Sequence, residues 1–84
     1  MPRKYSHRAE INLHGLNVAE AKSRLERLLV SLPPNITELI VIHGYHGGSA
    51  LQNMVRMQLK SNRIRQRMIS LNPGETILIL KERK

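Results

Sequence analysis

Two histidines in this chain, His14 and His43, each precede a glycine and each follow an apolar segment. Imidazoles donate and accept protons near neutral pH, so such a pair could serve as general base and acid on a nucleic-acid backbone without a metal. Alternatively, each ring only hydrogen-bonds nearby backbone and fixes its turn. If the segments Ile11–Gly15 and Ile40–Gly44 are adjacent parallel strands, both rings reach the sheet edge where open α/β folds bind ligands.

The residues around the histidines add candidate binding groups. Asn12 could orient a histidine or a phosphate through its amide, or could point into solvent from an edge strand. The glycine-rich connection after His43 leads into a predicted helix, whose first backbone amides would attract a phosphate. Within it, Tyr45 could stack on a base or simply pack against the loop. The candidate phosphate-binding residues of this connection are Gly44, Tyr45, His46, Gly47, Gly48 and Ser49.

The charge of the chain is strongly positive and unevenly distributed. The 14 Lys and Arg residues oppose 6 acids, all Glu, and the net charge is +8. No acid lies between Glu38 and Glu75. This acid-free stretch favours contact with a polyanion over a merely solvated surface. The residues expected to follow a nucleic-acid backbone, with little base specificity, are Arg56, Lys60, Arg63, Arg65 and Arg67.

Composition narrows the class of protein further. With 84 residues the chain fits one small domain, and without cysteine it has no disulfide or thiolate zinc site. The absence of Asp argues against a site of paired carboxylates for divalent metals, so we expect no metal and no cofactor. The first residues lack the apolar run of a signal peptide, and no stretch is long enough to cross a membrane. These features predict a cytoplasmic protein without a membrane partner.

Periodicity predicts strands over residues 10–14, 37–42, 65–71 and 76–80 and two helices between the first three. Asn17 with Glu20, and Ser49 with Gln52, have the spacing of capping boxes at the two helix starts. The second helix should carry a basic stripe formed by Gln52, Arg56 and Lys60. Residues 72–75 have the composition of a type II turn.

Two strand-helix-strand crossovers of one hand place both helices on one face of a mixed sheet. The resulting fold class is α/β, a two-layer βαβαββ sandwich. The opposite face would be partly apolar, and we expect the N-terminal tail, a protein partner or a second copy to cover it. Residues 10–80 would form the domain, residues 1–9 a flexible basic tail and residues 81–84 a charged tail.

The two His-Gly segments resemble the signatures of the Smr (small MutS-related) domain family. Asn12-Leu13-His14-Gly15 matches its apolar-Asp-Leu-His-Gly segment with Asn in place of Asp, and His43, Gly44 and Gly48 fit its His-Gly-x-Gly-x-Gly pattern. The resemblance covers about residues 10–80. It implies the fold of a bacterial translation initiation factor C-terminal domain, with strand order 1-2-4-3 in a four-stranded sheet.

The resemblance also implies nucleic-acid binding, DNA or RNA endonuclease activity in many members, and action on ribosomes in some. Asn12 replaces a residue implicated in cleavage, which places cleavage in more doubt than binding. Three hypotheses therefore remain from the sequence: a nucleic-acid-binding domain, an endonuclease using His14, His43 and Asn12, and a non-catalytic protein- or ribosome-interaction module.

Overall fold

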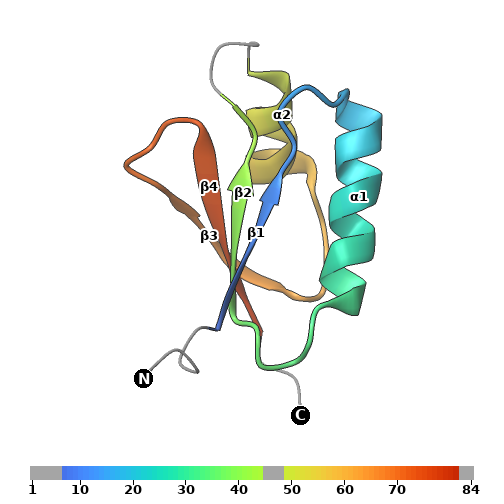
Figure 1. Cartoon of the computed structure of the whole chain (residues 1–84), viewed down its shortest axis with the longest axis vertical. Coiled ribbons are helices and arrows are strands. Elements are labelled where there is room, and N and C mark those ends of the chain that lie inside the picture. The colour runs from blue at the N-terminus through green and yellow to red at the C-terminus, as the bar shows by residue number, and fades with distance from the viewer. Residues whose placement is uncertain (1–6, 45–48, 82–84) are drawn as a thin grey trace.

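The computed structural model describes residues 7–44 and 49–81. The strands are β1 (Arg8–Asn12), β2 (Glu38–Ile42), β3 (Ile64–Ile69) and β4 (Glu75–Leu80). The helices are α1 (Val18–Ser31) and α2 (Ala50–Asn53), and α2 continues directly into the π-helical segment η2 (Met54–Gln58). The order of elements is therefore βαβαββ, as the sequence predicts (Figure 1).

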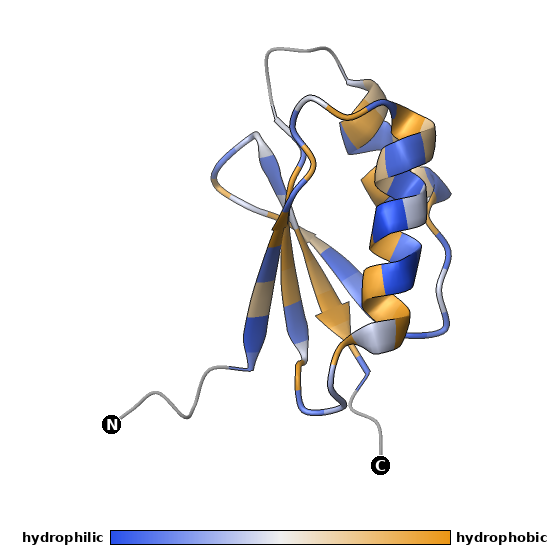
Figure 2. Ribbon diagram, turned by 45° about the vertical axis from the view of Figure 1, so that its right-hand side comes forward, coloured by the Kyte–Doolittle hydropathy of each residue, from blue (hydrophilic) through white to orange (hydrophobic). Residues whose placement is uncertain are grey.

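The four strands form one mixed sheet in the order β1-β2-β4-β3. β1 pairs in parallel with β2, and β4 pairs antiparallel with both β2 and β3. Both helical segments cover the same face of this sheet (Figure 2). The predicted strand order and two-layer architecture are confirmed, and the apolar β4 lies in the interior of the sheet rather than at an edge.

The core lies between the sheet and the helices. Alternate residues of β2 and β4, among them Leu39 and Leu78, are fully buried there, since successive side chains of a strand point to opposite faces. α1 contributes Ala21, Leu25 and Leu29 from one face. The buried apolar core consists of Leu13, Ala21, Leu25, Leu29, Leu39, Val41, Met54, Val55, Leu59, Leu78 and Leu80.

α1 begins as predicted. The Asn17 side-chain oxygen accepts a hydrogen bond of 2.8 Å from the Glu20 amide, which satisfies one of the unpaired donors of the first turn. The helix ends at Ser31, just before Pro33. This helix start is one wall of the site described below.

The second helix differs from the prediction. Ser49 makes no side-chain capping bond, and the Gln52 amide nitrogen donates instead to the Pro73 carbonyl at 3.4 Å. The helix ends at Gln58 with a π-type bond from the Leu59 amide to the Met54 carbonyl. The predicted basic stripe is therefore wrong: Lys60 lies beyond the helix end, while Gln52 faces the turn before β4.

The N-terminal boundary also shifts. β1 starts at Arg8 and ends at Asn12, two residues earlier than predicted at each end. Arg8 and Ala9 pair with Glu38 and Leu39, so part of the expected tail belongs to the sheet. The strand ends early because residues 13–16 form a turn. Residues 1–6 and 82–84, most of the two predicted tails, lie outside the described residues.

The turn at residues 72–75 is formed but is not type II. The Glu75 amide donates to the Asn72 carbonyl at 3.1 Å, which closes the turn. Gly74, however, lacks the positive φ that a type II turn requires at this position. The Asn72 side-chain oxygen accepts from the Gly74 amide at 2.9 Å, and this asparagine bond shapes the turn.

The face of the sheet away from the helices carries a row of partly exposed apolar side chains: Ile40, Ile42, Ile77 and Ile79. Ile40 lies opposite Ile77, and Met68, which is 44% exposed, lies opposite Ile77 on the other side. The predicted apolar character of this face is confirmed. The N-terminal tail that was expected to cover this face lies mostly in residues 1–6, which are outside the described residues.

Candidate nucleic-acid interface

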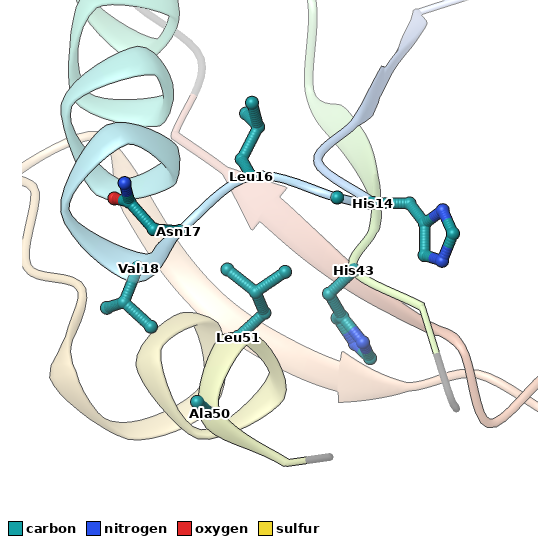
Figure 3. A pocket seen from close by; sticks show the side chains of 8 residues that line it. His14, Leu16, Asn17, Val18, His43, Ala50 and Leu51 are labelled. Atoms are coloured by element: carbon teal, nitrogen blue, oxygen red, sulfur yellow. The ribbon is translucent and has the colours of Figure 1, made fainter. Parts of the chain in front are cut away.

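A hollow of roughly 380 Å³ opens at the edge of the sheet where β1 and β2 end. The turn after β1, the start of α1 and the start of α2 surround it (Figure 3). Its lining residues are His14, Gly15, Leu16, Asn17, Val18, His43, Ala50 and Leu51. Both predicted histidines thus reach this edge, as expected from parallel neighbouring strands.

A tight turn holds His14 at the rim of the hollow. The Leu16 amide donates to the Leu13 carbonyl at 3.0 Å, and Gly15 has a φ of +90°, the geometry of a type II turn. The Asn12 side-chain oxygen accepts from the His14 amide at 2.9 Å. His14 itself is exposed. Asn12 therefore acts on His14 through the backbone, a contact that a carboxylate oxygen could also make.

Gly44 packs directly against the His14 ring. Its φ is +88°, and a Cβ built on it would lie 2.6 Å from the His14 Cδ2 atom. Glycine is required here both because this φ disfavours L side chains and because the ring occupies the space. Both His-Gly pairs thus place their glycine in the same backbone conformation, and Gly44 fixes one side of the His14 ring.

His43 has a different environment. Its side chain is only 3% exposed, its Nδ1 lies 3.0 Å from the Gly44 carbonyl, and its Nε2 lies 2.8 Å from the Thr76 hydroxyl. A carbonyl can only accept, so Nδ1 carries a hydrogen and Nε2 faces the Thr76 hydroxyl. The two imidazoles do not point toward each other (Figure 3). For His43 the contacts favour the alternative in which the ring hydrogen-bonds nearby groups and fixes its turn, and His14 is the exposed one of the two rings.

Arg56 extends this buried network. Its Nε donates to the same Thr76 hydroxyl at 2.8 Å, and its Nη2 donates to the Glu75 carbonyl at 3.3 Å. Because Thr76 Oγ1 accepts from Arg56, its hydroxyl hydrogen is available to His43 Nε2. Arg56 thus fixes Thr76 and, through it, His43, while part of its side chain remains exposed.

Arg63 is buried and is not available to the nucleic-acid backbone that it was expected to contact. It is 5% exposed, and its five N–H bonds donate to five backbone carbonyls at 2.7–3.2 Å. The acceptors belong to the end of α1, the connection to β2 and the residue after β4: Leu29, Leu32, Pro33, Ile36 and Lys81. Its assignment to phosphate contact is wrong, because every donor already has a protein acceptor.

The other basic candidates differ in availability. The Arg67 guanidinium donates to the Val55 carbonyl at 3.0 Å and to the Leu59 carbonyl. Both carbonyls lie at the end of the second helix, where carbonyls lack partners within the helix. Lys60 and Arg65 are exposed, and neither side chain makes a hydrogen bond or ion pair with any described residue. Ser49 is exposed beside the hollow. The remaining loop candidates, Tyr45, His46, Gly47 and Gly48, lie outside the described residues.

Residues 7–44 and 49–81 contain no group of three or more His, Cys, Asp or Glu side chains that could hold a metal ion. Within the same ranges, no helix is long and apolar enough to cross a membrane.

Comparison with known proteins identifies the family. The model of the Smr domain matches residues 11–76, so the chain belongs to the Smr domain family. The crystal structure of the Smr domain of Thermus thermophilus MutS2 is similar, with a TM-score of 0.72 and 26% sequence identity. The match covers 87% of this chain and 98% of that one. A search of curated proteins found no match.

The site contains residues that the sequence did not single out. Leu16, Val18 and Leu51 form an apolar wall of the hollow, and Thr76 connects His43 to Arg56. Asn17 was predicted only as a helix cap but also lines the hollow. The sequence does set Thr76 apart, since it is a hydroxyl residue that directly precedes the apolar residues of the last strand.

Proposed function

We propose that this Smr domain binds nucleic acid through the phosphate backbone, with little sequence specificity, at the edge where β1 and β2 end. The observation that carries the proposal is the exposed His14, which a fixed turn holds beside a hollow that the first residues of α1 also line. Backbone amides at a helix start favour an anion, and an imidazole beside them can donate to a phosphate oxygen.

The charge distribution supports the same proposal. Lys60 and Arg65 are exposed within the acid-free stretch, and Arg65 lies toward the far end of the sheet from the hollow, since the neighbouring Ile64 pairs with Leu80. The partly accessible Arg67 pairs with Leu78 in the middle of β4, and Arg56 bonds Thr76 at the end near the hollow, so the cations extend from the site along the sheet. Four such cations would release counterions on binding duplex DNA. The logarithm of affinity would then fall against the logarithm of salt concentration with a slope of about −3 to −4.

The contacts favour binding without cleavage by the histidine pair. General acid–base catalysis needs both imidazoles within reach of substrate, and both nitrogens of His43 have protein partners within 3.0 Å. The Asn12 oxygen also has a protein donor, the His14 amide. We therefore propose that His14 contacts the backbone while His43 and Asn12 position the loops around it.

Binding to matched single-stranded, duplex and branched DNA and RNA over a salt series tests this proposal. The double variant Lys60→Gln with Arg65→Gln should reduce the steepness of the salt dependence by about 2, since two phosphate contacts are removed. The matched control is Arg24→Gln with Arg27→Gln, which removes two exposed cations from α1 and should change the slope little. A slope near zero for the unmodified chain would exclude phosphate binding.

A cleavage assay separates binding from catalysis. Labelled DNA and RNA are incubated with the chain, with and without EDTA, beside the variants His14→Ala and His43→Ala. The proposal predicts no product above that of the His14→Ala variant. Product formed by the unmodified chain and lost in His14→Ala would establish a nuclease instead.

A second candidate function, a protein-interaction module, is favoured by the open face of the sheet. Its apolar row is bordered by Glu10, Glu38 and Glu75, which suit a protein partner or a second copy better than a polyanion. Glu38 is paired with Arg8 at 3.5 Å. Association through this face would depend little on salt and would weaken in an Ile77→Thr variant, which sedimentation equilibrium would detect for a homodimer.

A further inference from the structure

Leu71, at the tip of the β3–β4 hairpin, is fully exposed, with a relative accessibility of 104%. Ile69, at the end of β3, is also 73% exposed. A single exposed apolar residue is common, but two within three residues at the end of a projecting hairpin expose apolar surface without any packing role. The hairpin stands apart from the helices in Figure 1.

The turn that carries Leu71 is well ordered by its own hydrogen bonds. The Asn72 amide donates to the Ser70 hydroxyl at 3.1 Å, and this hydroxyl lies 3.4 Å from a Glu75 carboxylate oxygen. The Gly74 amide and the Glu75 amide both bond Asn72. Leu71 is therefore held outward by a closed turn rather than by a loose loop.

The same turn is bonded to the rim that carries His14. The Gly74 carbonyl accepts from the His43 amide at 2.9 Å and from the Gly44 amide at 3.1 Å. The Gln52 side chain adds a bond to the Pro73 carbonyl at 3.4 Å. Because Gly44 also packs on the His14 ring, the hairpin tip and the proposed phosphate site are parts of one connected edge.

We propose that Leu71 is an apolar wedge that inserts against an unpaired or weakly stacked base of the bound nucleic acid. The inference rests on the proposed function and specifies its substrate class as nucleic acid with a bulge or a similarly disrupted stack. Apolar side chains such as Leu and Ile unstack base steps in many complexes, and neighbouring cations hold the phosphates meanwhile. Arg56, whose Nη2 donates to the Glu75 carbonyl at the end of this turn, supplies such a partly exposed cation on the same edge.

The chain contains no tryptophan, so a Leu71→Trp variant places one fluorescent reporter at the tip. The probes are RNA and DNA duplexes with a single bulged 2-aminopurine, and the same duplexes fully paired. On binding the bulged duplex, the indole emission of Leu71→Trp should be quenched by base stacking. The matched control Val30→Trp, on the exposed surface of α1, should show no quenching.

Affinity provides the second measurement. Leu71→Ser should bind the bulged duplex roughly tenfold more weakly, with an unchanged salt slope and an unchanged affinity for the paired duplex. Its melting temperature should match that of the unmodified chain, because an exposed side chain is removed. Equal affinity of Leu71→Ser and the unmodified chain for the bulged duplex would overturn the wedge alone. Absence of binding to every probe at low salt would overturn the proposed function as well.

Discussion

The buried guanidinium of Arg63 gives the sharpest test of the structure. Replacing it in Arg63→Met removes five hydrogen bonds and leaves their carbonyl acceptors, one of them on the buried Leu29, without a donor. A single bond from a charged donor contributes about 1.5–3 kcal/mol, and such bonds are not additive. Breaking a buried charged network typically costs about 3–5 kcal/mol.

We expect Arg63→Met to lower the free energy of unfolding by about 3–4 kcal/mol, a large share of the 5–15 kcal/mol typical of small domains. At a urea dependence of about 1 kcal/mol per molar, the midpoint of unfolding should fall by about 3 M. Arg63→Lys should recover only part of the loss, since an ammonium group has three donors at one point rather than five in a plane.

Arg65→Met is the matched control, because Arg65 lies two residues from Arg63 but is exposed, and its side chain bonds no described residue. Its free energy of unfolding should change by less than about 0.5 kcal/mol, while its nucleic-acid affinity should become less dependent on salt. A loss below about 1 kcal/mol in Arg63→Met would refute the structural role assigned to Arg63. The same role would be refuted if Arg63→Met changed the salt dependence of nucleic-acid binding as much as Arg65→Met does.

Three further predictions follow from the rim. Gly44→Ala should cost about 1–2 kcal/mol of backbone strain and shift the NMR signals of the His14 ring, whereas Gly15→Ala, whose Cβ meets nothing within 4 Å, should cost the strain without the shift. Thr76→Val removes a hydroxyl shared by a buried imidazole and a guanidinium and should cost about 1–3 kcal/mol by urea unfolding, while Thr76→Ser should cost less. Asn12→Asp keeps an oxygen for the His14 amide, so its unfolding free energy should stay within about 0.5 kcal/mol, and a larger loss would show that the amide nitrogen is needed.

The layers and the interior place of the last strand were predictable because they depend on patterns that extend over whole segments, whereas the full strand order was an expectation from the resemblance to the Smr family. The apolar run in β4 demanded an interior position, and the strand–helix–strand units fixed the parallel pair. The cap at Asn17 was predictable for a similar reason, since its amide acceptor is only three residues away.

Details that depend on distant atoms could not be predicted. Ser49 has the same cap spacing as Asn17, yet its backbone angles of −105° and 5° are not the extended ones that a capping residue needs. Arg63 is indistinguishable in sequence from the exposed Arg65, because its acceptors lie as many as 34 residues away. Arg63 is buried because the end of α1 and the residue after β4 come together around its guanidinium in the folded chain.

The two His-Gly pairs have the same residue types and the same positive φ at their glycines. The surroundings of the two histidines differ, however, because β1 is an edge strand and β2 is an inner one. Alanine replacements at the two histidines therefore answer different questions. His14→Ala removes an exposed ring and reports on ligand contact, whereas His43→Ala opens a buried hydrogen-bonded position and reports first on folding. Lost activity in the second variant would not by itself show that its imidazole meets a substrate.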